Sequence, residues 1–269
     1  VLNTEKDRGY AFEEQLNENT KGYLNRRLYE YYLPEYNSEI PMLIINPTII
    51  NNGKRLIISP QPISYLSYIK PQKNIKNEYL IESLEFSRFF KEQGSDNLRF
   101  TSALRMSSTF PYVMPIVHLP SSPEFKVMDA GLRDNFGIKN SIKFLYTFNE
   151  WITENTSGVV FIQIRDAKKK PELDKKKNQT FIESIALPLK TVYKNIFLTQ
   201  DYDHDQIIEY ANEWFNGDME VINLVLNNTK EKQLSLSWHL TESEKKATYN
   251  SIHSVNNKKA FKRIEELLK

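Results

Sequence analysis

Hydrophobic residues recur along the chain in two rhythms, one typical of helices and one typical of strands. The helical rhythm is clearest over residues 135–154. There the apolar positions fall at steps of three and four residues: Ile138, Ile142, Leu145, Phe148 and Ile152. The same rhythm predicts one or two helices over residues 10–33, and further helices over residues 78–93, 98–107, 181–198, 206–215, 241–251 and 257–268.

Short apolar runs predict the strands. Residues 41–46 and 55–59 are separated by Asn51-Asn52-Gly53, a turn signal that predicts an antiparallel hairpin. Further strands are expected over residues 125–129, 159–164 and 220–226. Because 159–164 is almost continuously apolar, it is typical of a strand buried on both faces of a parallel sheet. With the helix before it, it predicts a βαβ unit over 125–164, and hence an α/β fold.

Composition excludes several classes of function. Lys and Arg total 36 against 34 for Asp and Glu, a net charge of +2, so no nucleic-acid partner is indicated. The chain has no cysteine, which excludes thiolate chemistry and disulfides, and its four histidines are too dispersed for a zinc site. Apolar runs are too short to cross a bilayer, and the polar start at Val1 resembles a trimmed or processed terminus rather than a signal segment. The compartment stays undetermined.

Asp129 is the strongest candidate for chemistry. It ends the strand 125–129, where open α/β sheets place their ligand crevices. Gly131 permits a tight turn, and Asp134 or Asn135 could cap the next helix. The alternative interpretation is that Asp129 only organises its own turn through side-chain hydrogen bonds.

Other polar features have simpler interpretations. Ser107 and Ser108 precede the Asp129 strand, but no elbow surrounds them, so we expect them to line a pocket or cap a helix end. The acidic run 201–205 begins like a calcium loop but lacks its Gly and final Glu, which favours a solvated helix start. The basic run 168–177 could contact phospholipid headgroups, although a solvated loop is the simpler interpretation.

An aromatic cluster stands out near the start of the chain: Tyr29, Tyr31, Tyr32 and Tyr36. Such side chains serve most often in core or partner packing, and contact with an acyl chain is the alternative.

A resemblance to the patatin-like phospholipase family covers roughly residues 1–165. Residues 101–115 resemble its Ser-rich helix end and proline-aromatic loop, and 127–131 with Asn135 resembles its catalytic Asp turn and helix start. The segments around 42–58 and the Asp7-Arg8-Gly9 entry are also similar to larger bacterial members. The turn here reads Asp-Ala-Gly and Asn135 is followed by Phe-Gly, both departures from the family pattern.

The resemblance implies a Ser-Asp dyad that hydrolyses lipid or other acyl esters without a cofactor. Asp129 would be the base, and a pocket or turn would be formed by Ala130, Gly131, Asn135, Ser107 and Ser108. The implied fold is part of a three-layer α/β/α sheet. Residues 1–165 would be the C-terminal part of the catalytic domain, and 166–269 a mostly helical α/β extension packed on the same domain. Peripheral membrane contact is a further expectation.

The serine itself is missing from this sequence. No G-x-S-x-G elbow and no glycine-rich oxyanion loop occurs among the 269 residues. We therefore expect a missing N-terminal half of the same protein to supply both, which leaves this chain inert alone. The sheet edge exposed by the loss of that half should be covered by another copy, by a second fragment or by the chain's own helices. The alternative hypothesis is a non-catalytic interaction or scaffold module that retains the fold.

Overall fold

The computed structural model describes residues 7–69, 80–110, 114–166, 181–226 and 240–269. Over these ranges the protein is mixed α/β, as predicted. The chain forms two compact units, Val1–Phe144 and Leu145–Lys269, and the division falls inside helix α6 (Ile138–Thr147). The predicted functional division at residue 165 stays a prediction.

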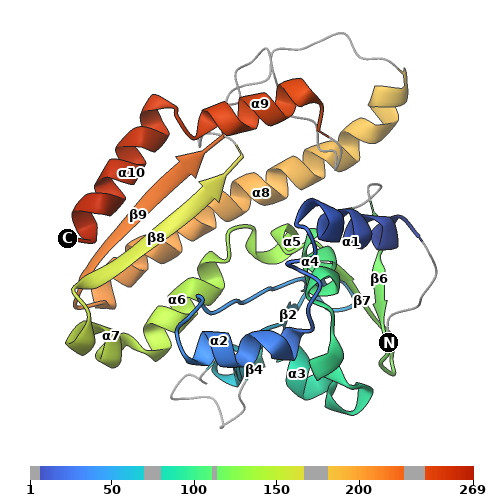
Figure 1. Cartoon of the computed structure of the whole chain (residues 1–269), viewed down its shortest axis with the longest axis horizontal. Coiled ribbons are helices and arrows are strands. Elements are labelled where there is room, and N and C mark those ends of the chain that lie inside the picture. The colour runs from blue at the N-terminus through green and yellow to red at the C-terminus, as the bar shows by residue number, and fades with distance from the viewer. Residues whose placement is uncertain (1–6, 70–79, 111–113, 167–180, 227–239) are drawn as a thin grey trace. The chain divides into compact units, whose positions relative to one another are not determined.

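The first unit contains a five-stranded sheet in the order β5-β2-β1-β7-β6 (Figure 1). Strand β2 runs parallel to β5, whereas the pairs β1/β2, β1/β7 and β6/β7 are antiparallel. The strands of this sheet are β1 (Thr48–Ile49), β2 (Arg55–Ile57), β5 (Ser83–Glu85), β6 (Val117–Leu119) and β7 (Phe125–Met128). A separate antiparallel pair is formed by β3 (Tyr68–Ile69) and β4 (Leu80–Ile81).

Short helices surround this sheet. Helix α4 packs on β7, and α1 packs on α4 (Figure 1). The α-helices are α1 (Arg8–Asn19), α2 (Tyr32–Tyr36), α3 (Phe86–Phe89), α4 (Phe100–Ser108), α5 (Gly131–Asp134) and the start of α6; the 3-10 helices are η1 (Leu28–Tyr31), η2 (Ser64–Leu66), η3 (Lys91–Gln93) and η4 (Ser95–Asn97). The apolar faces of the sheet and of α4 form one buried cluster, which includes Leu56, Val127, Ala103 and Met106.

The second unit is built on a parallel strand pair. Strands β8 (Gly158–Arg165) and β9 (Asp218–Val225) are joined by the long helix α8 (Phe181–Trp214). Helix α10 (Val255–Leu267) packs on β9, and α7 (Asn149–Asn155) and α9 (Glu242–Ser251) complete the unit. None of the described helices combines the length and apolar character needed to cross a bilayer.

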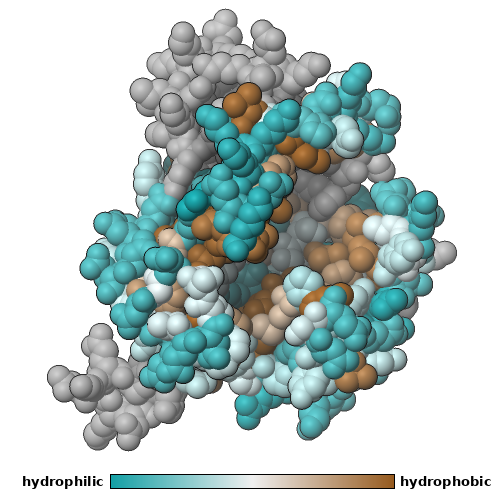
Figure 2. Space-filling view, turned by 60° about the vertical axis from the view of Figure 1, so that its left-hand side comes forward, coloured by the Kyte–Doolittle hydropathy of each residue, from teal (hydrophilic) through white to brown (hydrophobic). Residues whose placement is uncertain are grey.

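Apolar residues also reach the surface, as the brown areas of Figure 2 show. On β8 the exposed apolar side chains alternate along the strand: Val160, Ile162 and Ile164 are 37%, 49% and 75% exposed. Within the described ranges β9 is the strand partner of β8, so the other edge of β8 has no strand beside it. The expected covering of a sheet edge by another copy, a second fragment or the chain's own helices stays a prediction.

Several predicted elements are confirmed. The hairpin forms across the predicted turn, although its first strand is Thr48–Ile49 rather than residues 41–46. Thr48 lies opposite Arg55, and Gly53 adopts the positive φ of 69° that its turn requires. The helix expected at 98–107 is α4, and the strand expected at 220–226 is β9. Thr241 and Glu244 form the predicted capping box at the start of α9.

The helix predicted over residues 78–93 is wrong. The described part of this segment contains strands β4 and β5, followed by the single turns α3 and η3. Strand β5 forms because its backbone completes the sheet beside β2, and because buried Glu85 accepts hydrogen bonds from the Ile63 amide (3.1 Å) and the Ser64 hydroxyl. Tertiary pairing therefore overrides an amphipathic pattern that local spacing alone favours as a helix.

The βαβ unit predicted over residues 125–164 is wrong, and β8, α8 and β9 form a βαβ unit instead. Strand β7 belongs to the five-stranded sheet, and the parallel partner of β8 is β9, across α8. The helix predicted over 135–154 is interrupted, because Gly137 has φ 68° before α6 and Phe148 leaves the helical region between α6 and α7. Conversely, the two helices predicted at 181–198 and 206–215 are one helix, α8.

Candidate functional site

Asp129 directly follows β7, the strand that lies between β1 and β6. Its turn is tied to the end of α4 by two backbone hydrogen bonds. The Asp129 amide donates to the Thr109 carbonyl (3.0 Å), and the Ala130 amide donates to the Ser107 carbonyl (3.0 Å). Two segments that sequence analysis singled out separately, Ser107–Ser108 and the Asp129 turn, therefore lie together.

The Asp129 carboxyl is half-buried and accepts a hydrogen bond at Oδ1 from the Gly131 amide (2.7 Å). Burial raises the pKa of Asp129 to about 6, and the Gly131 hydrogen bond partly opposes this by favouring the charged form. A carboxylate with a pKa just below neutrality is ionised at pH 7 and is a stronger base than an ordinary aspartate. The side chain thus combines fixed geometry with an altered basicity.

Strand β1 and the residues before it hold both ends of this turn. The Thr48 hydroxyl donates to the Asp129 carbonyl (3.0 Å), and the Asn46 amide group donates to Asp134 Oδ2 (3.5 Å). Asn46 and Thr48 are two residues apart in an extended segment, so their side chains emerge on the same side of it. They fix the turn from Asp129 to Asp134 at two points.

Asp134 also caps α6, and it is one of the two residues predicted to cap the helix after the turn. Its carboxylate accepts from the Lys139 amide (3.2 Å) and the Asn140 amide (3.3 Å). The other candidate, Asn135, is exposed at the end of α5.

A buried arginine behind the turn escaped sequence analysis. Arg55 on β2 is fully buried, lies 3.5 Å from Asp134 Oδ2, donates to Asn140 Oδ1 (2.7 Å) and pairs with Glu82 (2.8 Å). Glu82 also pairs with Lys143 of α6 at 3.4 Å, and burial lowers the pKa of that lysine. The sequence contains a signal for this buried network, because Arg55 is a charged residue at the start of the apolar run 55–58. A charge in such a run needs a buried partner.

The remaining predicted site residues differ in their surroundings. Ala130 and Ser107 are half-buried at the turn. The Ser108 hydroxyl donates to the Leu104 carbonyl (2.8 Å) inside α4, an interaction that fits the predicted role at a helix end. The Asp129 carboxylate is therefore not the hydrogen-bond acceptor of Ser108.

The Asp7-Arg8-Gly9 segment docks α1 on α4. The Asp7 carboxylate caps α1 through the Tyr10 amide (2.8 Å) and pairs with Arg105 (2.9 Å). A Cβ atom on Gly9 would lie 2.0 Å from the Arg105 guanidinium carbon, so glycine leaves room for that side chain. Glu13, one turn further along α1, accepts from the Ser102 hydroxyl (2.8 Å) and lies 3.5 Å from Arg105.

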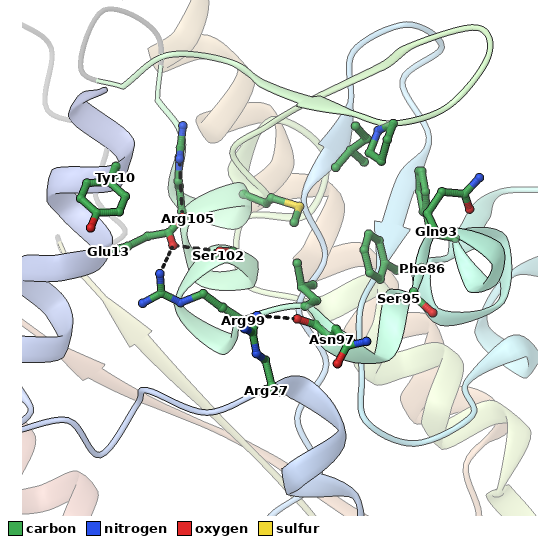
Figure 3. A pocket seen from close by; sticks show the side chains of 16 residues that line it. Tyr10, Glu13, Arg27, Phe86, Gln93, Ser95, Asn97, Arg99, Ser102 and Arg105 are labelled. Carbon is green, nitrogen blue, oxygen red and sulfur yellow. Dashed lines mark hydrogen bonds and ion pairs between the residues drawn. The ribbon is translucent and has the colours of Figure 1, made fainter. Parts of the chain in front are cut away.

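A cavity of about 480 Å³ lies next to this α1–α4 contact (Figure 3). Its lining comes from α1, α3, η3, η4, α4 and the end of β6, all in the first unit. Asp129 is not among its lining residues. The cavity and the Asp129 turn are thus separate features.

The remaining predictions concern the basic run, the acidic run, the tyrosine cluster and a metal site. The basic run 168–177 lies outside the described residues. Residues 201–205 are helical within α8, so they form neither a calcium loop nor a helix start. Of the tyrosine cluster, Tyr31 packs against Phe100 with ring centroids 4.9 Å apart, whereas Tyr29 and Tyr36 are exposed. Among the described residues, no His, Asp and Glu side chains cluster as a metal site would require.

Comparisons with protein-family models, curated proteins and solved structures found no match for this chain. Its function therefore has to be inferred from its own residues.

Proposed function

We propose that this chain supplies the carboxylate base of a patatin-like serine acyl hydrolase whose serine and oxyanion donors lie outside the 269 residues. The observation that carries the proposal is the state of Asp129. Its carboxyl stands at the end of a sheet strand, is held by the Gly131 amide, remains half-buried, and has a pKa raised to about 6. The Gly131 hydrogen bond fits both a turn-organising and a catalytic aspartate, and burial with a raised pKa favours the catalytic one, because such shifts cluster at functional sites.

In the proposed reaction Asp129 accepts the serine hydroxyl proton as the oxygen attacks the ester carbonyl. The negative charge that develops on the carbonyl oxygen requires hydrogen-bond donors, which the missing glycine-rich loop would provide. Collapse of the tetrahedral intermediate breaks the ester bond, and the proton passes from Asp129 to the leaving alkoxide. Water then hydrolyses the acyl-serine by the same steps, with Asp129 again accepting a proton.

Strand β8 leaves room for further elements in the proposed whole protein. Parallel strands are normally buried among further strands and helices, and a two-strand parallel sheet is marginal on its own. Within the described ranges, β8 pairs on one edge only and exposes Val160, Ile162 and Ile164 on one face. The three-layer patatin-like fold that we propose for the whole protein would need further strands and helices to cover strands such as β8.

The test uses the natural polypeptide that contains this sequence, with hydrolysis of a p-nitrophenyl acyl ester as readout. Asp129→Asn keeps an oxygen for the Gly131 amide but removes the proton acceptor. We expect it to lower kcat/KM at least a hundredfold, the usual scale for a positioned general base. The matched control is Asp96→Asn, which removes an exposed carboxylate and should leave the rate unchanged.

Circular dichroism should show that both variants remain folded. If Asp129→Asn hydrolyses the ester as fast as Asp96→Asn does, the proposed role of Asp129 is wrong.

A further inference from the structure

The cavity beside the α1–α4 contact has two chemically different walls. One wall is apolar and is formed by Phe86, Phe90, Leu98, Met106 and Leu119. The opposite wall carries charged and polar side chains, among them Glu13, Arg27, Arg99, Ser102 and Arg105 (Figure 3). At about 480 Å³ the cavity falls within the roughly 300–1,000 Å³ range of small-molecule sites.

The buried carboxylate on the polar wall is already satisfied. Glu13 is only 4% exposed, accepts from the Ser102 hydroxyl and lies 3.5 Å from Arg105 and 3.9 Å from Arg99. Arg105 is further paired with Asp7. These groups fix the wall and leave Glu13 no need for a cation from solution.

Arg27 differs from the other two arginines. Its guanidinium donates to the Asn97 carbonyl (2.8 Å), and among the described residues it forms no ion pair with a carboxylate. An antiparallel backbone bridge places Arg27 directly opposite Arg99. Arg99 is already paired with Glu14 (3.3 Å) and lies 3.9 Å from Glu13, so Arg27 is the guanidinium on this wall that has no carboxylate partner among the described residues.

We propose that this cavity binds an amphipathic monoanion, namely a fatty-acid carboxylate. The carboxylate pairs with the Arg27 guanidinium, and the hydrocarbon chain lies against Phe86, Phe90 and Met106. A planar carboxylate matches the paired donors of guanidinium groups. Burying the chain against aromatic and sulfur-containing side chains supplies the apolar part of the binding free energy.

This site stands apart from the proposed hydrolytic centre, because Asp129 does not line the cavity. The inference therefore does not rest on the proposed function.

The test measures binding of decanoate to the 269-residue chain by titration calorimetry, below the concentration at which decanoate forms micelles. Decanoate should bind saturably, whereas decanol, which has the chain without the charge, and acetate, which has the charge without the chain, should bind at least tenfold more weakly. Decanoate should also raise the thermal midpoint of unfolding. Asp129→Asn should bind decanoate as the wild type does, which separates this test from that of the hydrolase.

Two variants locate the site. Arg27→Gln should weaken decanoate binding roughly tenfold, as expected for loss of a hydrogen bond to a charged group, and Arg27→Lys should restore part of it. Gln93→Trp, at an exposed position of the lining, should fill the cavity and abolish binding without disturbing the core. The matched control, Arg133→Gln, removes an exposed arginine outside the cavity and should bind decanoate normally.

The proposal is overturned if decanoate shows no saturable binding, or if decanol binds equally well. It is also overturned if folded Gln93→Trp and Arg27→Gln both bind decanoate as tightly as Arg133→Gln does.

Discussion

At the scale of single residues, the candidate site depends on how one carboxyl group is held. The Asp129 carboxyl accepts a hydrogen bond from the Gly131 amide, and the Asp129 carbonyl accepts one from the Thr48 hydroxyl. These contacts fix the group while partial burial raises its pKa to about 6. Sequence analysis could identify Asp129, because a carboxylate after an apolar strand is visible in the pattern. It could not give the pKa, which depends on packing by distant segments.

The raised pKa predicts that Asp129 destabilises the folded protein at neutral pH. Between about pH 4 and about pH 6 the folded state holds this proton more tightly than the unfolded chain, whose pKa is near 3.8. Stability should therefore fall as pH rises through this window, and the penalty should be complete above it. Asp129→Asn should be more stable than the wild type at pH 8 by on the order of 1–2 kcal/mol, with little difference below pH 4.

Urea denaturation at a series of pH values measures this difference. Asp96→Asn should follow the wild type throughout. A pH dependence that is the same in the wild type and in Asp129→Asn would contradict the assigned burial of this carboxyl.

The buried arginine gives a second prediction at this scale. Arg55→Met should leave Asp134 buried without its cation and should lower the free energy of unfolding by about 3–5 kcal/mol. Because the two groups interact, adding Asp134→Asn to Arg55→Met should cost less than the sum of the two single changes. Lys54→Met, one residue earlier and outside the network, is the control for denaturation in urea.

At the scale of elements, local signals were sufficient where neighbouring residues decide the structure. The Asn52-Gly53 hairpin, the Thr241–Glu244 capping box and helix α4 follow from such signals. Local signals failed where contacts between residues distant in sequence decide the structure. Strand β5 forms because β2 pairs with it, and β8 pairs with β9 across a long helix rather than with β7.

Helix α8 illustrates the second case. The acidic run 201–205 looked like a break between two helices, yet the helix continues through it. Within the second unit, Arg165 of β8 pairs with Asp201 at 2.6 Å, and His204 is only 2% exposed. These buried contacts explain why the segment stays helical against its composition.

A proline substitution tests the continuity of α8. Asp203 is exposed in the middle of this helix, so Asp203→Pro should destabilise the second unit by about 3 kcal/mol or more, whereas Asp203→Ala should be nearly neutral. Thermal unfolding followed by circular dichroism gives the comparison. If the proline is tolerated as well as the alanine, residues 201–205 form a loop and not a helix.

At the scale of the whole molecule, the proposed hydrolase needs a serine elbow that does not occur among these 269 residues. Asp129 lies in the first unit, and β8 in the second unit has a single strand partner among the described residues. Both features are accounted for if a serine-bearing segment outside this sequence completes the protein. We therefore expect the 269-residue chain alone to show no ester hydrolysis above the rate of a heat-unfolded sample, in an assay that detects the natural polypeptide readily.

The most direct test of the central claim is the pH dependence of kcat/KM for ester hydrolysis by the natural polypeptide, followed at a wavelength insensitive to pH. If Asp129 is the base, kcat/KM should rise with pH and level off with an apparent pKa near its value of about 6, and Asp129→Asn should lose this rise together with the activity. Hydrolysis that is independent of pH between about 4 and 8, or an Asp129→Asn variant with the wild-type profile, would contradict the assignment of Asp129 as the base.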